Sequence, residues 1–209
     1  MKLIYGTYNP SKLTSMIKML DGLNIEITGI SSVDFKLRES DESGKDPLAN
    51  AVEKATTYFE QLNKPVFSCD TGLFFEGVEE EDQPGVLVKR IHGEDLSYRE
   101  MVDYYSNLAA KYGGRLTAYY KNGICLYIDN DHIYKYDGED LCSERFYIAD
   151  KPHKRYREGF PLDTLSVDME TMKYYYDLED EKSESLGIIP GFRDFFIRSL
   201  GDYLKTKSS

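Results

Sequence analysis

An α/β fold is predicted by three features of the sequence. Residues 3–5 form a short apolar run that is typical of a buried strand. Residues 12–20 carry apolar side chains at the i, i+3, i+4 and i+7 positions of one helix face. Asp46 followed by Pro47 is a typical helix start, because a capping side chain precedes proline at the first helical position. Strands therefore alternate with helices in the first half of the chain.

The same patterns predict the remaining elements and a division into two lobes. We expect strands at residues 24–30, 66–69, 115–128, 132–136 and 146–149, and helices at residues 47–62, 97–112 and 190–204. A core lobe is expected to comprise residues 1–114 and 186–209, and a β-rich lobe residues 115–185. Clefts between lobes are common ligand sites.

Composition narrows the range of partners. The chain has 209 residues and a net charge of −11, which argues against a nucleic-acid polymer as partner, because a phosphate backbone requires a basic surface. A small phosphorylated ligand is compatible with a local basic pocket. No apolar run approaches the ~18–20 residues that cross a membrane. The first residues also lack a secretory pattern, so a cytoplasmic location is expected.

The turn after the first strand, at residues 6–12, is a candidate anion site. Backbone N–H groups at a helix N-terminus lack intrahelical partners, and the helix dipole favours negative charge there. Thr7 and Asn9 add neutral donors, and Lys12 adds a mobile cation. The alternative is an ordinary strand–turn–helix joint, because the chain has no G-x-x-x-x-G-K-[ST] motif.

A second candidate site begins at Asp70, directly after the strand predicted at residues 66–69. An aspartate at the exposed end of a central strand can hold Mg²⁺ or activate a water molecule. The alternative is a turn without function, since Asp-Thr-Gly is common turn chemistry.

The order of these motifs resembles one known family. The chain reads T-x-N-x-x-K at residues 7–12, N-A-x-x-K-A at 50–55, D-T-G-L at 70–73 and P-G-V at 84–86. This layout is similar to the T-G-N-x-x-K, E-N-A-x-x-K-A, D-D-S-G-L and P-G-V/I motifs of the inosine triphosphate pyrophosphatase family, whose substrates are non-canonical purine nucleoside triphosphates. Residues 158–163 resemble the family's G-F-G-Y-D-P segment, and Arg193 falls where its S-H-R ends.

The resemblance implies an elongated two-lobed α/β fold, with mixed sheets flanked by helices and a central cleft. It also implies Mg²⁺ dependence and a homodimer. The expected reaction is hydrolysis of a nucleoside triphosphate to the monophosphate and pyrophosphate. The assigned residues are Asp70 and Lys12 for catalysis, Asp70 for the metal ion, and Thr7, Asn9, Lys12, Thr71, Phe160, Asp163 and Arg193 for the substrate.

The chain departs from the family at the metal site and in the first motif. Ala49 stands where the family has a glutamate ligand, Cys69 replaces the first acid of D-D, and Tyr8 replaces the glycine of T-G-N. A tyrosine at Tyr8 is strained if that position needs a positive φ. Asp46 and Glu53 lie about one helical turn from Ala49 and are the candidates for a substitute carboxylate. The alternatives are a helix cap for Asp46 and a solvated side chain for Glu53.

A further departure affects recognition of the base. Gly187 and Phe192 stand where the family has a lysine and a histidine that recognise the purine 6-oxo group and phosphate. Altered base choice is therefore expected. Phe192 is expected either to stack on a base or to pack in the core. The alternative function is a nucleotide-binding or interaction protein that keeps the fold without turnover.

Overall fold

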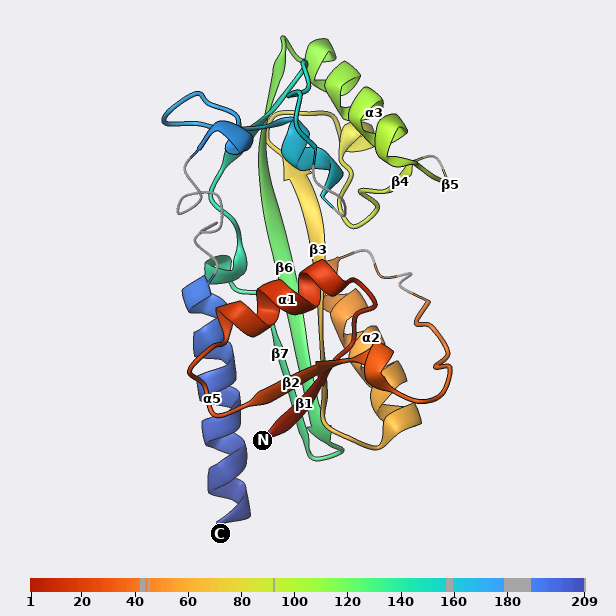
Figure 1. Ribbon diagram of the computed structural model, residues 1–209, viewed down its shortest axis with the longest axis vertical. Helices are drawn as coiled ribbons and strands as arrows, with labels where there is room; N and C mark the ends of the chain where they lie inside the picture. Colours follow the sequence, from red (N-terminus) through yellow and green to blue (C-terminus); the bar gives the residue numbers. More distant parts are fainter. Residues whose placement is uncertain (42–43, 45, 92, 157–159, 179–188, 209) are drawn as a thin grey trace. The chain divides into compact units, whose positions relative to one another are not determined.

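The computed structural model describes all residues except 42–43, 45, 92, 157–159, 179–188 and 209. The chain forms two compact units, with its elements labelled in Figure 1. Unit 1 comprises Met1–Thr71, Asn122–Leu141 and Ile188–Ser209, and unit 2 comprises Gly72–Lys121 and Cys142–Gly187. Two long strands, β3 (Val66–Phe75) and β6 (Arg115–Asp129), contribute residues to both units.

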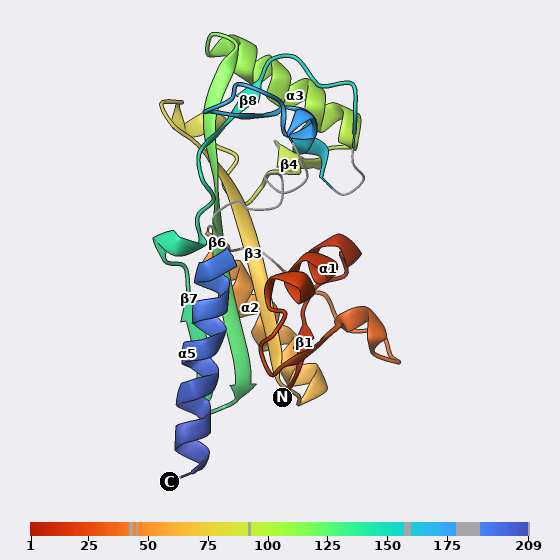
Figure 2. The same cartoon turned by 60° about the vertical axis from the view of Figure 1, so that its left-hand side comes forward.

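Unit 1 is built around β1 (Lys2–Tyr5), which pairs in parallel with β2 (Glu26–Gly29) on one side and with β3 on the other. The strand β6 follows β3 in the sheet, and β7 (His132–Tyr136) pairs with β6 in antiparallel orientation. The helices of this unit, visible in Figures 1 and 2, are α1 (Pro10–Met19), α2 (Pro47–Leu62) and α5 (Ile189–Lys207).

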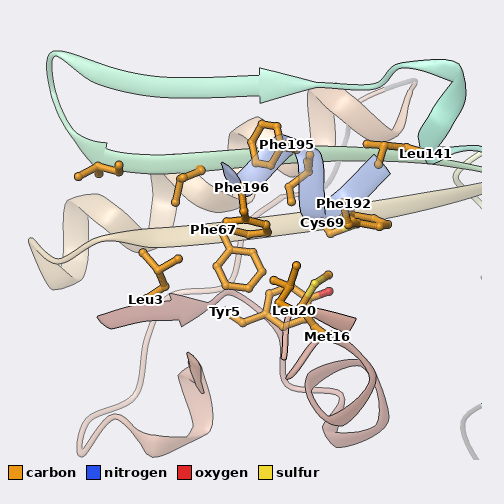
Figure 3. Close-up of a cluster of buried hydrophobic side chains, with 13 residues drawn as sticks. Leu3, Tyr5, Met16, Leu20, Phe67, Cys69, Leu141, Phe192, Phe195 and Phe196 are labelled. Atoms are coloured by element: carbon orange, nitrogen blue, oxygen red, sulfur yellow. The ribbon is translucent and has the colours of Figure 1, made fainter. Parts of the chain in front are cut away.

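Alternation along β3 sends its side chains to two different helical layers. Phe67 and Cys69 enter a core cluster with side chains of α1 and α5, shown in Figure 3. Val66 enters a separate cluster with Tyr58 of α2. Successive residues of a strand point to opposite faces. The sheet of unit 1 is therefore covered by α1 and α5 on one face and by α2 on the other.

The described part of unit 2 contains antiparallel strands of the same sheet and one long helix. In this sheet β8 (Phe146–Ala149) pairs with β6 and with β9 (Ser166–Asp168). The helix α3 (Tyr98–Lys111) packs against β8, and a capping box between Ser97 and Glu100 fixes its start. The short strands β4 (Arg90–Ile91) and β5 (Glu94–Asp95) form a separate pair. Short 3-10 helices lie at Ile30–Ser32, Glu80–Asp82, Glu139–Leu141, Pro161–Thr164 and Tyr175–Asp177.

The α/β class and the positions of the long elements agree with the sequence analysis, whereas the predicted lobes differ from the two units. The helix α3 belongs to unit 2 and not to the core lobe, and Asn122–Leu141 belongs to unit 1 and not to the β-rich lobe. The reason is that β3 and β6 each pass from one unit to the other, so the boundaries fall inside strands. Composition changes mark loops and do not reveal such a boundary. Among the described residues, no helix is long and apolar enough to cross a membrane.

Gly123 of β6 determines how closely α2 approaches the sheet. A Cβ atom on Gly123 would lie 2.4 Å from the backbone nitrogen of Leu48 and 2.6 Å from the carbonyl carbon of Pro47. We expect Gly123→Ala to lower the free energy of unfolding by about 1–3 kcal/mol, because rigid backbone has to move. Urea unfolding of the variant measures this change.

Gly201→Ala is the matched control for this prediction. A Cβ atom on Gly201, inside α5, meets nothing within 4 Å. Alanine is a better helix former than glycine by about 1 kcal/mol, so this variant should be as stable as the parent or more stable. Equal losses of stability in both variants would contradict the close contact at Gly123.

Candidate active site

Asp70 is a buried carboxylate that two side chains of α2 hold. The Nδ2 atom of Asn50 donates a hydrogen bond of 2.9 Å to Oδ2, and Nζ of Lys54 lies 3.4 Å from Oδ1. Asp70 is only 8% exposed. Asn50 and Lys54 are four residues apart on α2 and so share the helix face that meets β3. Asp70 itself lies inside β3 and not in a turn after the strand, because β3 continues to Phe75.

The turn after β1 is organised by Asn9. Its Oδ1 atom accepts hydrogen bonds from the backbone N–H groups of Ser11 at 2.9 Å and Lys12 at 3.3 Å, which caps α1. The Oγ1 atom of Thr7 accepts from the backbone N–H of Asn9 at 3.2 Å. The expectation of unpaired N–H groups at this helix start is therefore wrong at Ser11 and Lys12, since the asparagine satisfies them. An anion here would meet side-chain donors: the Nδ2 group of Asn9, the hydroxyl of Thr7 and the ammonium of Lys12.

Tyr8, which stands in place of the family glycine, is not strained. Among the described residues other than glycine, positive φ angles occur only at Asn63 and Met172. The ring of Tyr8 is half exposed beside the turn. The turn therefore accepts a side chain at this position.

The two candidate motifs lie side by side in the sheet of unit 1. In the parallel pair of β1 and β3, Tyr5 is opposite Phe67, and the backbone N–H of Gly6 donates a hydrogen bond of 2.8 Å to the carbonyl oxygen of Phe67. The turn after β1 therefore lies beside the middle part of β3, which contains Asp70. The thiol of Cys69 lies in this region. Burial raises its pKa to about 12, the charge of Lys12 lowers it, Asp70 raises it and Lys54 lowers it. The charges of Lys12, Lys54 and Asp70 thus all act on the position of Cys69, which stays a neutral thiol where the family has an acid.

Neither candidate for a second carboxylate contacts Asp70 in the described structure. The Oδ1 atom of Asp46 accepts a hydrogen bond of 2.9 Å from the backbone N–H of Ala49, so Asp46 is the cap of α2. The Oε1 atom of Glu53 accepts one of 2.8 Å from the backbone N–H of Asp41. In the described part of the chain, no group of three or more His, Cys, Asp or Glu side chains is placed to hold a metal ion. The capping alternative for Asp46 is the one that the structure supports.

Arg193 lies away from these residues within unit 1. Its Nη1 atom donates hydrogen bonds to the carbonyl oxygens of Met19 at 3.1 Å and Asp21 at 2.7 Å. Met19 is the last residue of α1 and Asp21 lies just beyond the helix, whereas Lys12 is in its first turn. The expectation that Arg193 reaches the nucleotide is not supported, because its guanidinium satisfies carbonyls that a helix end leaves open.

The other residues assigned to base recognition lie in different surroundings. Phe192 is 2% exposed and belongs to the core cluster drawn in Figure 3, so it packs in the core. Phe160 and Asp163 are in unit 2, at the start of and within the 3-10 helix Pro161–Thr164. Burial raises the pKa of Tyr120, and the charge of nearby Asp163 adds to the rise. Gly187 lies outside the described residues.

Three side chains that hold Asp70 and Thr71 were not among the residues expected at the site. Asn50 and Lys54 stand in the N-A-x-x-K-A motif, and their i, i+4 spacing was the available signal for a shared target. Asn122 accepts a hydrogen bond of 2.7 Å from the hydroxyl of Thr71. Since Asn122 is 51 residues from Thr71 in the chain, no local pattern could have identified it.

Comparison with known proteins identifies the family. The sequence profile of the Ham1 family matches residues 3–176. The chain belongs to the Ham1 family. This membership confirms the resemblance to inosine triphosphate pyrophosphatases that the motifs indicated.

Curated relatives of this Ham1 chain are named dITP/XTP pyrophosphatase. The protein from Rhodopseudomonas palustris is 29% identical over 136 residues, which cover 63% of each chain. The protein from Thermoanaerobacter pseudethanolicus is 33% identical over 100 residues, which cover 48% of this chain and 49% of the relative. The match to the Bacillus subtilis protein is longer, at 25% identity over 183 residues, 87% of this chain and 88% of the relative. The chain thus spans between about half and two thirds of the length of the first two relatives.

Solved structures of Ham1 proteins share the fold. The Ham1 protein from Coxiella burnetii aligns with a TM-score of 0.72 at 19% identity, over 99% of each chain. The Staphylococcus aureus Ham1 protein aligns with a TM-score of 0.66 at 21% identity, over 99% of this chain and 100% of the other. At these identities the likeness shows the mixed α/β fold alone.

The contact between Lys54 and Asp70 makes a testable contribution to stability. We expect Lys54→Met to lower the free energy of unfolding at pH 8 by about 1–3 kcal/mol, because it leaves a buried carboxylate without its cation. Urea unfolding of the variant and the parent at pH 8 measures this loss.

Lys2→Met is the control for this measurement. The pair of Lys2 and Glu26 is exposed, at 82% and 59% of the two side chains, so its removal should change stability by less than about 0.5 kcal/mol. Losses of the same size for Lys2 and Lys54 would argue against a special role for the buried pair.

Proposed function

We propose that the protein is a Mg²⁺-dependent hydrolase that converts nucleoside triphosphates to nucleoside monophosphates and pyrophosphate. The observation that carries the proposal is the position of the turn at residues 6–12, which follows β1 beside the part of β3 that contains Asp70. The names of the curated relatives, dITP/XTP pyrophosphatase, support the same reaction. The homodimer and the cytoplasmic location stay predictions.

In this proposal, the turn and α2 supply the charge that a triphosphate needs. Lys12 and Lys54 bring two ammonium groups to the surroundings of Cys69, and Asn9 and Thr7 bring neutral donors. Asp70 acts as the base that orients the attacking water, since its carboxylate is fixed by Asn50 and Lys54. Phosphoryl transfer depends mainly on such positioning and charge neutralisation.

The donor set around Asp70 fits a magnesium ion shared with the substrate. Mg²⁺ is often held by one or two carboxylates together with substrate phosphates. Asp70 offers the carboxylate, and Oδ1 of Asn50 is a buried oxygen without a hydrogen-bond partner among the described residues. Asp70 would hold the ion with oxygens of the triphosphate. The ion would neutralise phosphate charge, and the rest of its ligands would come from substrate and solvent.

We further propose that base choice is broad. Phe192 packs in the core and Arg193 caps α1, so neither is in place to select a 6-oxo purine in the family manner. Phe160 and Asp163 of unit 2 are the residues that we assign to the base. Without side chains that donate hydrogen bonds to the 6-oxo group, discrimination between bases should be weak.

A panel of nucleotides tests the activity. The purified protein with Mg²⁺ should release pyrophosphate from ITP, XTP, dITP, GTP and ATP, with kcat/KM values within about tenfold of one another. Asp70→Asn should lower kcat by about 100-fold or more, because it removes the base. Asp95→Asn is the control, since Asp95 pairs with Arg90 at the surface of unit 2 and should leave the rate unchanged. Absence of release from every nucleotide, or an unchanged rate in Asp70→Asn, would refute the proposal.

A second candidate is a nucleotide-binding protein without turnover. The specific observation in its favour is that Cys69 is a neutral thiol in place of an acid, which leaves Asp70 as the one carboxylate at the site among the described residues. This candidate would give thermal stabilisation by nucleotide without pyrophosphate release. The same panel, read by thermal denaturation, therefore separates the two functions.

Restoring the family glutamate at position 49 tests whether the proposed metal site lacks a carboxylate ligand. Ala49 is exposed and is the third residue of α2, where a glutamate also completes a capping box with the start of the helix. We expect Ala49→Glu to lower the Mg²⁺ concentration for half-maximal activity by about three- to tenfold, because a second carboxylate favours the ion. Ala49→Gln keeps the cap without the charge and should leave the Mg²⁺ requirement near that of the parent. Equal behaviour of the two variants would argue against a metal ion at this end of α2.

A further inference from the structure

The hydroxyl group of Thr71 donates its only proton to the side chain of Asn122. Its Oγ1 atom lies 2.7 Å from Oδ1 of Asn122, and Nδ2 of Asn122 lies 2.7 Å from the carbonyl oxygen of Leu141. A carbonyl oxygen can only accept a hydrogen bond, so the amide group that faces Leu141 has to be the NH₂ group. The other end of the amide is then an oxygen, and Thr71 has to be the donor to it.

This assignment leaves the Thr71 oxygen as an acceptor. A hydroxyl has one proton and two lone pairs, and the proton is committed to Asn122. Asn122 is 5% exposed, so solvent competes little for these bonds. Donation to Asn122 also polarises the hydroxyl and makes its oxygen a better acceptor. Phosphate oxygens are acceptors as well, so Thr71 can reach a triphosphate only through a group that donates to both.

Lys12 belongs to α1, the helix that packs against the face of β3 that carries Cys69. Side chains two residues apart in a strand share a face, so Thr71 points to the same face as Cys69. Cys69 packs in the cluster with α1, and the charge of Lys12 acts on its thiol. Lys54, in contrast, approaches the other face with Asp70. An ammonium has three protons and can serve a hydroxyl oxygen and a phosphate together.

We propose that Asn122 and Thr71 form a relay that positions Lys12 on the triphosphate. Thr71 accepts a hydrogen bond from the Lys12 ammonium, and Asn122 is a positioning residue that acts through Thr71. The proposal rests on the proposed function for the identity of the ligand. It replaces the direct donation from Thr71 to phosphate that the family resemblance implies.

Binding of inorganic triphosphate, measured by isothermal titration calorimetry, tests the relay without turnover. We expect Thr71→Val to weaken binding by about five- to tenfold, because valine has nearly the shape of threonine but lacks the hydroxyl oxygen that accepts the hydrogen bond. Thr71→Ser should recover most of that loss. Thr28→Val, on the exposed face of β2, is the control and should bind as the parent does.

Double variants separate the relay from a structural role. In the Lys12→Ala background, Thr71→Val should add less than a twofold further loss, because the donor is already absent. Asn122→Ala should weaken binding in the parent and add little in the Thr71→Val background. It should lower the melting temperature in both backgrounds, because the Leu141 carbonyl loses its donor. Equal losses from Thr71→Val with and without Lys12, or no loss in the parent, would overturn the relay.

Failure of the relay and failure of the proposed hydrolase activity give different results in the binding and pyrophosphate-release measurements. A protein that binds inorganic triphosphate with this pattern but releases no pyrophosphate from nucleotides would keep the relay and refute the hydrolase. A protein that binds no inorganic triphosphate would overturn the relay directly. A fall in kcat with unchanged triphosphate affinity in Thr71→Val would also overturn it, since Thr71 would then act on the reacting water.

Discussion

The contact of α2 with the sheet is the constraint on which the candidate site depends. Gly123 allows the first turn of the helix to lie directly on β6, where any side chain would collide with backbone. From that position Asn50 and Lys54 reach Asp70, a carboxylate that is almost fully buried. A buried carboxylate without such partners would be strongly unfavourable. The geometry of the site therefore follows from the packing of one helix more than from the loops around it.

The sequence predicted those parts of the fold that local chemistry determines. Asp46 and Pro47 located the start of α2, because capping and proline geometry act within a single turn. Asp70 was harder, since Asp-Thr-Gly favours a turn, yet β3 continues to Phe75. The backbone N–H of Leu73 pairs with the carbonyl of Gly85, a tertiary contact that overrides the local preference.

The site was predictable only in part, for a related reason. The motifs identified Asp70 and the turn at residues 6–12, and parallel pairing of β1 with β3 explains why they meet. The role of Asn9 differs from the expected one. Its side-chain oxygen caps α1 and so occupies backbone N–H groups that were expected to be open to an anion. Arg193 also differs, since its position at the start of α5 brings it to the far end of α1. Asn122 had no local signal at all, as its partners come from other segments.

The charge of the candidate site differs from that of the whole chain. The chain as a whole has a net charge of −11, but the described charged groups that act on Cys69 are two lysines, Lys12 and Lys54, and one carboxylate, Asp70. A thiol whose pKa is about 12 adds no negative charge at neutral pH. Because Cys69 stands where the family has an acid, this site is less negative than a family site with both acids. Such a site attracts a polyanion more readily and a free divalent cation less readily than one with paired acids. A metal ion would then be expected to arrive with the triphosphate, and the protein's own selectivity would rest on how its two ammonium groups and their hydrogen-bond partners fit the phosphate chain.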